Sequence, residues 1–312
     1  MEKPYRDLAT YLKEKTGEKT VKLCIDGGFT CPNRDGSRST GGCLFCGARG
    51  AGDFTLDPSL AIAEQVHTRL SAPLGGRRAS RFIAYFQSFS STYAPPVVLR
   101  ARYDAALCDA RVIGLAVATR PDCVDEAVAD LLAEYAAHMT VWVELGLQTA
   151  SDETAARMNL ACPRSEFSRA VALLTSRGVD TVAHMMVGLP GEGREDALST
   201  LRMINAHPVC GVKIHSLYVM RDTPLAAMWQ SGEYEPLTFA EYTETVALLL
   251  AHLRPDMVVH RLTGDCPKHE LLAPLWSAEK NKVLDRIHAI LRERGWRQGC
   301  LYHQERGCRI LA

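Results

Sequence analysis

The sequence predicts an α/β protein built on a parallel sheet, and two observations support this fold class. Strand-like and helix-like segments alternate along most of the 312 residues, a pattern typical of sheets whose crossover connections are helices. The strand-like segments are also apolar nearly throughout, as expected of parallel strands that are covered on both faces. This periodicity is compatible with a barrel and with a doubly wound open sheet.

The alternation begins with a helix and contains six strands. Apolar Leu8, Tyr11 and Leu12 share one helical face ahead of Gly17, and glycine commonly ends helices. The segments between the later strands have the helical spacing of apolar residues. The expected strands are residues 21–25, 81–87, 112–119, 140–148, 181–188 and 211–219, and the expected helices are 5–15, 59–70, 96–108, 124–137, 164–176 and 194–206.

The C-terminal part departs from this alternation. Two helix-like segments, 238–253 and 278–294, flank a short segment at 257–264, MVVHRLTG. No linker composition separates them from the preceding strands. The expected organisation is an N-terminal helix in residues 1–20, a sheet domain in residues 21–222, and a mostly helical extension packed on that domain in residues 223–312.

Composition and charge limit the class of protein. Lys plus Arg equals Asp plus Glu at 36 each, which argues against a broadly basic nucleic-acid-binding surface, though not against a local patch. No apolar run approaches the ~20 residues of a membrane span, and the N-terminus is charged rather than signal-like. We therefore expect a soluble, cytoplasmic protein without membrane contact, in a compartment that keeps thiols reduced.

Three cysteines form the clearest motif. Cys31, Cys43 and Cys46 have the spacing C-x11-C-x2-C in a loop rich in Gly, Pro, Asn, Asp and Ser, directly after the first strand. Three thiolates leave one iron of a [4Fe–4S] cluster without a protein ligand, and a cofactor can bind there. The alternative is zinc with Cys24 as fourth ligand, although a thiol inside an apolar run more often packs as a small hydrophobe.

The remaining cysteines give a weaker signal. Most lie singly in helical or strand-like stretches, as inert thiols usually do. A second metal site formed by Cys300 and Cys308 with Cys266 or His303 is the alternative.

Further motifs occur in order along the chain, and together with GGCLFC at 41–46 they resemble a known family. They are YFQSFSSTYAP from Tyr85, ATRPDC from Ala118, VELGLQ from Val143, VGLPGE from Val187, GVKIH from Gly211 and HRLTGDCP from His260. The chain resembles the radical S-adenosylmethionine (SAM) enzymes, in particular the YhcC/YtqA-like branch, which is related to the elongator catalytic subunit and to oxygen-independent coproporphyrinogen oxidase. The resemblance implies a partial (β/α)6 TIM-type barrel, and a [4Fe–4S] cluster on Cys31, Cys43 and Cys46 whose open iron binds SAM.

The resemblance also implies which residues bind the cofactor at the carboxyl ends of the strands, where the chemistry of such barrels is located. Gln87 and Ser88 lie on the turn that receives the SAM amino group. Gln148 corresponds to a SAM ligand, and His184 takes the place of an acidic residue that contacts the ribose. For each of them an ordinary structural role is the alternative.

Four other residues are candidates for the same cofactor site. Glu144 shares one strand face with Gln148, and a buried carboxylate there needs a partner. Arg120 is suited either to a bidentate contact with a carboxylate or to a loop salt bridge. Gly188 and Glu192 lie in a turn whose backbone can approach the adenine ring. Candidates for substrate contact are Lys213, His215, His260, Arg261, Thr263 and Asp265, with internal pairing as the alternative.

One stretch departs from the family pattern. Relatives commonly carry Asn-Arg-Gly-His after the fourth strand, with the Arg on the SAM carboxylate, whereas this chain has Leu160 and Cys162 in place of the Arg and the His. Leucine cannot bind a carboxylate. The expectation is that Arg157 or Arg120 supplies the charge, or that SAM binds more weakly than in relatives.

The activity implied by the resemblance is reductive cleavage of SAM to a 5′-deoxyadenosyl radical that abstracts hydrogen from a substrate. The electron comes from a flavodoxin- or ferredoxin-like donor. The branch suggests a tRNA substrate, with a wobble uridine converted from carboxymethylaminomethyl to aminomethyl. A basic connector with Arg77, Arg78 and Arg81 is available for phosphates. The alternatives are a small-molecule substrate, or a non-catalytic iron–sulfur or zinc protein on the same barrel.

Overall fold

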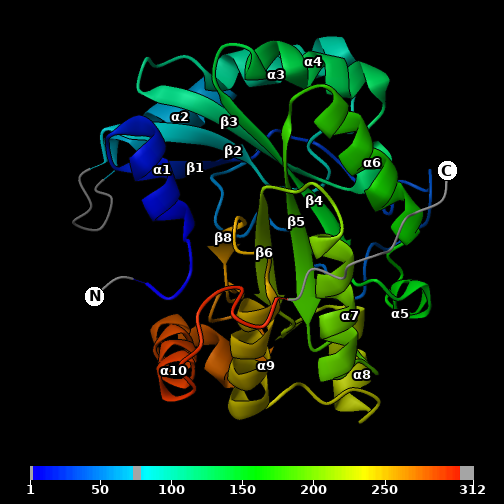
Figure 1. The fold of residues 1–312 in the computed structure, drawn as a ribbon. Coiled ribbons are helices and arrows are strands. Elements are labelled where there is room, and N and C mark those ends of the chain that lie inside the picture. Colours follow the sequence, from blue (N-terminus) through cyan, green and yellow to red (C-terminus); the bar gives the residue numbers. More distant parts are fainter. Residues whose placement is uncertain (1–2, 73–78, 303–312) are drawn as a thin grey trace, which may run out of the picture.

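A curled half-barrel of seven parallel strands forms the centre of the computed structural model, which describes residues 3–72 and 79–302 (Figure 1). The strand order is β1-β2-β3-β4-β5-β6-β8, so each strand lies beside its neighbour in sequence except where β6 pairs with β8. This is the partial barrel that the family resemblance implies. The strands of this sheet are β1 (Thr20–Ile25), β2 (Arg81–Phe86), β3 (Val112–Thr119), β4 (Thr140–Gln148), β5 (Asp180–Val187), β6 (Gly211–Ser216) and β8 (Val258–Arg261).

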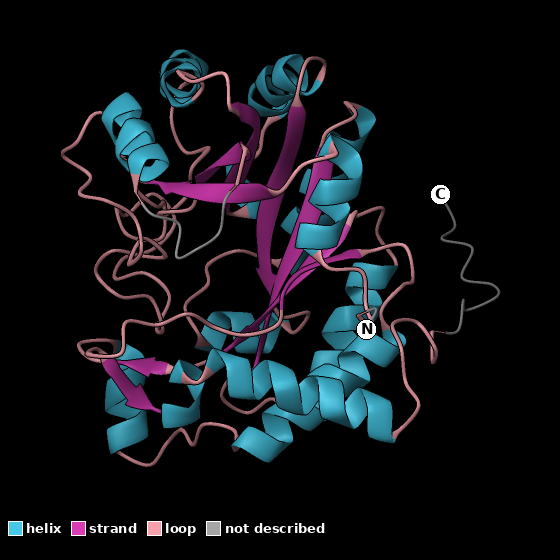
Figure 2. Cartoon of the chain, turned by 90° about the vertical axis from the view of Figure 1, so that its left-hand side faces the viewer, coloured by secondary structure: helices cyan, strands magenta, loops and turns pink. Residues whose placement is uncertain are grey.

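Helices cover the outer side of the sheet, and a small antiparallel pair of strands lies apart from it (Figure 2). α2 packs on β1, α4 and α6 on β4, and α7 on β5. The pair consists of β7 (Val219–Met220) and β9 (Leu271–Ala273). The helices are α1 (Leu8–Thr16), α2 (Ile62–Ser71), α3 (Pro96–Ala106), α4 (Glu126–Ala136), α5 (Asp152–Arg157), α6 (Arg164–Ser176), α7 (Arg194–Asn205), α8 (Pro224–Gln230), α9 (Phe239–His252) and α10 (Lys280–Glu293).

The helix boundaries have local causes. The Asp125 side chain accepts a hydrogen bond from Val128 N at the start of α4, and Thr238 and Glu241 form a capping box at the start of α9. Such caps satisfy backbone N–H groups that have no partner within the helix. Gly17 ends α1 in the left-handed conformation, with φ 74°. None of the described helices has the length and apolarity that a membrane span requires.

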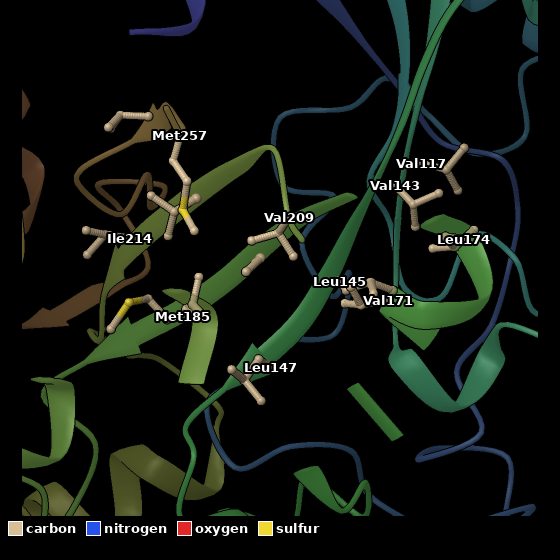
Figure 3. Close-up of a cluster of buried hydrophobic side chains, with 14 of the residues drawn as sticks. Val117, Val143, Leu145, Leu147, Val171, Leu174, Met185, Val209, Ile214 and Met257 are labelled. Carbon is tan, nitrogen blue, oxygen red and sulfur yellow. The ribbon is translucent and has the colours of Figure 1, made fainter. Parts of the chain in front are cut away.

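Alternating residues of each strand divide between two faces of the sheet. On the outer face, β4 contributes Val143 and Leu145, which pack with Val171 and Leu174 of α6 in one large apolar cluster (Figure 3). The inner face begins at the amino ends of the strands with a smaller apolar layer closed by Leu12 of α1. That layer contains Ile83, Tyr85, Ala116, Trp142 and Val182. Above it, toward the carboxyl ends, the inner face becomes polar.

The expected count of six strands was one too low. The segment 257–264 contains β8, which pairs with β6 in parallel. This strand was not recognised in the sequence because it carries a polar residue, His260, whose side chain contacts Glu144 on the inner face. The C-terminal extension thus supplies a strand to the same sheet as residues 21–222. The short helices α5 and α8 were also not predicted.

A cofactor pocket at the carboxyl ends of the strands

A cavity of about 190 Å³ opens at the carboxyl ends of the strands, and most of the predicted site residues line it. Cys31, Cys43 and Cys46 contribute from the loop after β1. The strand side chains reach it from β2, β3, β4, β5 and β6, which places residues from distant parts of the chain around one space. The predicted residues on its wall are Cys31, Cys43, Cys46, Gln87, Arg120, Glu144, Gln148 and His184.

The cysteine loop is held by hydrogen bonds to its thiols and carbonyls. Asn33 Nδ2 donates to Cys43 Sγ at 3.5 Å, and Ser90 Oγ donates to Cys31 Sγ at 3.6 Å. The Arg34 Nη2 group donates to the carbonyl oxygens of Cys46 and Gly47 at 3.0 and 2.6 Å. These donors hold two of the three sulfurs in place.

Cys43 and Cys46 need a positive centre to ionise at neutral pH, because both thiol pKa values are raised. Burial, together with the neighbouring Cys46, raises the pKa of Cys43 to about 12, and burial also raises the pKa of Cys46. Metal binding supplies the compensating charge, because a coordinating thiol loses its proton. The donor set of three thiols open to one cavity therefore fits a [4Fe–4S] cluster with one open iron.

The zinc alternative finds less support. Cys24 packs on the inner face of β1 with the apolar layer and is not part of the cavity wall. The alternative second metal site includes His303 and Cys308, which lie outside the described residues.

Arg120 forms the loop salt bridge that was one of its two expected roles. Its Nε and Nη2 groups donate to the two carboxylate oxygens of Asp122, both at 2.9 Å, and its Nη1 and Nη2 groups donate to the carbonyls of Leu160 and Ala161. These four contacts use four of the five guanidinium N–H groups, which leaves one N–H for a cofactor. Arg157 is not on the cavity wall and lies against Gly191.

Position 160 therefore has a structural function. The Leu160 side chain is 4% exposed and packs with Met158 and Met186 in a second apolar cluster, while its carbonyl accepts from Arg120. Arg34 lines the cavity near the cysteines as well as Arg120, and its guanidinium lies over the Phe89 ring at 5.3 Å. In the sequence, only the position of Arg34 between Cys31 and Cys43 could have indicated that it lines the cofactor cavity.

Strained backbone gathers around the cavity. Phe89, Gln148, Asn159 and Ala161 have φ values of 57°, 65°, 51° and 49°, a region that residues other than glycine seldom adopt. Such strain is concentrated at functional sites. At Gln148 the pairing of β4 with β5 shifts register, and the Oε1 atom is buried without a hydrogen-bond partner among the described residues.

A charged network forms the floor of the cavity. The Glu144 carboxylate is 2% exposed, and it accepts hydrogen bonds from Lys22 Nζ at 3.1 Å, Lys213 Nζ at 3.1 Å and Tyr85 Oη at 2.6 Å. Trp142 Nε1 donates to it at 3.3 Å. Glu144 thus has the partners that a buried carboxylate requires.

The network shifts several pKa values. Burial alone would raise the pKa of Glu144, but the ammonium groups of Lys213 and Lys22 hold it well below its usual value. Burial lowers the pKa of Lys213 to about 8, against the attraction of Glu144. Burial and the positive charge of Lys213 keep the pKa of His184 well below its usual value, so the imidazole is neutral. Its Nε2 atom is buried and has no partner in the described part of the chain.

Three predicted residues lie elsewhere. Ser88 is fully buried beside Gly52 and does not line the cavity, whereas its neighbours Gln87, Phe89 and Ser90 do. Gly188 packs against Leu237, and Glu192 accepts a hydrogen bond from Thr149 Oγ1 at 2.5 Å. The turn after β5 therefore contacts Leu237 and Thr149, which lie just before α9 and just after β4. Gly188 and Glu192 line a separate hollow there rather than the cavity.

Some of the other candidates are paired within the protein, whereas Thr263 Oγ1 and Arg261 Nε are buried without a hydrogen-bond partner among the described residues. His215 Nδ1 bonds to the carbonyl of Ser216, and Arg261 forms an ion pair with Asp265 at 2.7 Å. Of the basic connector, Arg81 pairs with Glu18 at 3.3 Å, while Arg77 and Arg78 lie outside the described residues. Lys213 is the substrate candidate that reaches the cavity wall.

Comparison with known proteins agrees with this geometry. Residues 36–204 match the Radical SAM superfamily and residues 209–293 match the Radical SAM C-terminal domain. YtqA of Bacillus subtilis is 38% identical over 97% of this chain and 94% of its own, and YhcC of Escherichia coli is 38% identical over 91% of each. A tRNA uridine(34) acetyltransferase of Dehalococcoides mccartyi is 29% identical over 64% of this chain and 42% of its own.

A solved structure has the same fold. The archaeal Elp3 of Methanocaldococcus infernus superposes with a TM-score of 0.69 and 16% identity, over 89% of this chain and 64% of that one. The superfamily match spans more than half of the chain, and two relatives are similar over nearly their whole length. The chain therefore belongs to the radical SAM superfamily, whose enzymes use a [4Fe–4S] cluster and SAM.

Proposed function

We propose that Cys31, Cys43 and Cys46 hold the [4Fe–4S] cluster and that SAM and substrate share the cavity beside them. The observation that carries this proposal is the wall of the cavity, which combines these three thiols with unpartnered polar atoms on the strands. A cluster held by these three thiols would supply one electron for reductive cleavage of SAM to methionine and a 5′-deoxyadenosyl radical, which would abstract a hydrogen atom from the substrate. The electron comes from a flavodoxin- or ferredoxin-like donor.

The chain's own residues position and shield the reactants. Asn33 and Ser90 orient the cysteine sulfurs. Gln148 Oε1 and His184 Nε2 each lack a partner among the described residues, so each is available to a polar group of SAM. Leu147 and Leu160 on the wall exclude water from the reacting groups.

We also propose that the substrate is a tRNA wobble uridine carrying a carboxymethylaminomethyl group, which is converted to aminomethyl. Two similarities support this choice: the relative named for acetylation of tRNA uridine 34 and the shared fold with Elp3. The zero net charge of the chain adds no support of its own.

The first experiment measures 5′-deoxyadenosine from anaerobically reconstituted protein with SAM and dithionite. The wild type is expected to form it, and the Cys31→Ala/Cys43→Ala/Cys46→Ala variant is expected to bind no cluster and form none. Cys24→Ala is the matched control, because it removes a thiol outside the cavity and should keep both the cluster and the activity. Loss of the cluster in Cys24→Ala would contradict the assignment of the three ligands.

The second experiment tests the substrate. Deletion of the gene should leave carboxymethylaminomethyluridine unprocessed in total tRNA, measured by nucleoside mass spectrometry, and the wild-type gene should restore the aminomethyl product. An unchanged nucleoside profile would rule out this substrate and favour a small molecule.

A further inference from the structure

The floor of the cavity contains more positive than negative charge. Glu144 is a single carboxylate between the ammonium groups of Lys22 and Lys213. The neighbouring Arg261 is matched by Asp265 at 2.7 Å. Because burial lowers the pKa values of His184, His215 and His260, these imidazoles add no charge. The network therefore has one positive charge in excess.

This excess is located on Lys213 rather than on Lys22. The Lys22 side chain is 22% exposed and lies over the Tyr85 ring at 4.0 Å, so water and the ring both stabilise its ammonium group. The Lys213 side chain is only 9% exposed. Burying a charge without a full counter-charge is unfavourable. The Lys213 ammonium group is in this situation, because it shares its carboxylate, Glu144, with Lys22.

Lys213 also has unused hydrogen-bonding capacity inside the cavity. Its ammonium group donates to Tyr85 Oη at 3.0 Å and to Glu144 Oε2 at 3.1 Å. The third N–H has no acceptor among the described residues, and Lys213 is part of the cavity wall. In the sheet register Lys213 is the direct partner of His184, whose Nε2 atom is likewise without a partner.

Lys213 lies slightly deeper in the sheet than Gln148. β6 ends at Ser216, three residues after Lys213, whereas Gln148 ends β4 and Gln87 directly follows β2. In the sheet register Gln148 pairs with Met185 and Met185 with Ile214, so Lys213 lies one residue, about 3.3 Å, before the level of Gln148.

We propose that Lys213 binds a carboxylate of the substrate at the floor of this cavity, an inference that deepens the proposed function and rests on it. One carboxylate neutralises the single excess charge and accepts the unused N–H of Lys213. His184 lies beside it as a neutral hydrogen-bonding group. The carboxymethylaminomethyl arm of the proposed uridine carries one such carboxylate at its end.

A labelling experiment on the reconstituted protein with SAM tests the site without any tRNA. Cyanate carbamylates unprotonated amines, and mass spectrometry of peptides gives the rate at each lysine. Acetate is expected to slow the carbamylation of Lys213 at least threefold, whereas neutral acetamide of nearly the same shape is expected to leave it unchanged. Chloride keeps the ionic strength constant, and exposed Lys268 serves as the internal control.

Two results of this experiment would overturn the proposal. One is equal labelling of Lys213 with acetate and acetamide. The other is absence of labelling at Lys213 in every sample, because a cavity closed to cyanate is also closed to a substrate arm.

The second arm compares Lys213→Met with Lys213→Arg. In Lys213→Met, the affinity for SAM and the 5′-deoxyadenosine formed without tRNA should stay within about twofold of wild type, while turnover of the modified tRNA falls at least 100-fold. Lys213→Arg should recover at least a tenth of wild-type turnover. Weaker SAM binding in Lys213→Met would assign the residue to the cofactor and contradict the proposal. A wild type inactive on this tRNA would refute the proposed substrate, while the labelling result would still decide the carboxylate site.

Discussion

The two faces of the sheet differ in what their side chains do, and β4 shows the contrast within one strand. Val143 and Leu145 point outward into the large apolar cluster that holds the helices. Trp142 and Glu144, which alternate with them, point inward and bond to each other and to charged groups from other strands. Burial of apolar side chains on the outer face therefore stabilises the barrel. The charges buried on the inner face beside the cavity offset part of that stabilisation.

The largest effect on stability is expected at Glu144. Glu144→Gln keeps the shape of the side chain but leaves the Lys213 ammonium group buried without its only carboxylate. Removal of one partner from a buried ion pair typically costs 3–5 kcal/mol, so we expect the free energy of unfolding to fall by about 4 kcal/mol in urea titrations.

Lys213→Met is the control for this change, because Glu144 then still pairs with Lys22 and accepts from Tyr85. We expect that variant to remain within about 1 kcal/mol of wild type. A loss in Lys213→Met as large as that in Glu144→Gln would contradict an excess of positive charge at the floor.

A somewhat smaller loss is expected one residue along, on the outer face. Leu145 is fully buried in the apolar cluster, and Leu→Ala substitutions at such positions cost about 2–5 kcal/mol through lost burial and a residual cavity. We expect Leu145→Ala to lower the free energy of unfolding by about 3 kcal/mol and to leave 5′-deoxyadenosine formation per folded molecule unchanged. A change in that activity would show that the two faces are coupled.

The pH dependence of stability offers a third test. The pKa of Lys213 is about 8 in the folded protein and near 10.5 when exposed. Between these pH values the unfolded chain holds a proton that the folded chain has released, so the free energy of unfolding rises with pH across this window. Relative to Lys213→Met, wild type should gain roughly 2 to 3 kcal/mol between pH 8 and 10.5. A constant difference between the two proteins would contradict the lowered pKa.

The sequence predicted the outer face better than the inner face, and the reason is physical. Apolar runs such as 112–119 and 140–148 contain the local information that makes a buried strand, and both are strands with these bounds. The cysteine spacing is equally local, and the three thiols do share one cavity. The strand β8 was not predicted because its His260 and Arg261 interrupt the apolar pattern that identifies buried strands.

The partners within the floor network could not be predicted in the same way. Lys22, Tyr85 and Lys213 reach Glu144 across 122, 59 and 69 residues of chain, and only the register of four strands brings them together. The strand pattern identified Glu144 as a buried carboxylate that needs a partner, but it could not say which residue is that partner. Similarly, the two roles left open for Arg120 depended on Leu160 and Ala161, whose carbonyls lie 40 and 41 residues further on.

The smallest effect is expected at Glu192, which lies on neither face and tests how far the cofactor site extends. Glu192 is off the cavity wall, and burial raises its pKa against the hydrogen bond from Thr149. A raised carboxyl pKa stabilises the fold at low pH, and this contribution is lost as pH rises through the folded pKa. Glu192→Gln keeps an acceptor for Thr149, so at pH 7 its free energy of unfolding should be within about 1 kcal/mol of wild type. The variant has no carboxyl group at this position, so it should not show the wild type's loss of stability as pH rises above 4.5. Its affinity for SAM, measured by equilibrium dialysis, should also be unchanged. A tenfold weaker SAM affinity would extend the cofactor site to the turn after β5, as the family resemblance implies.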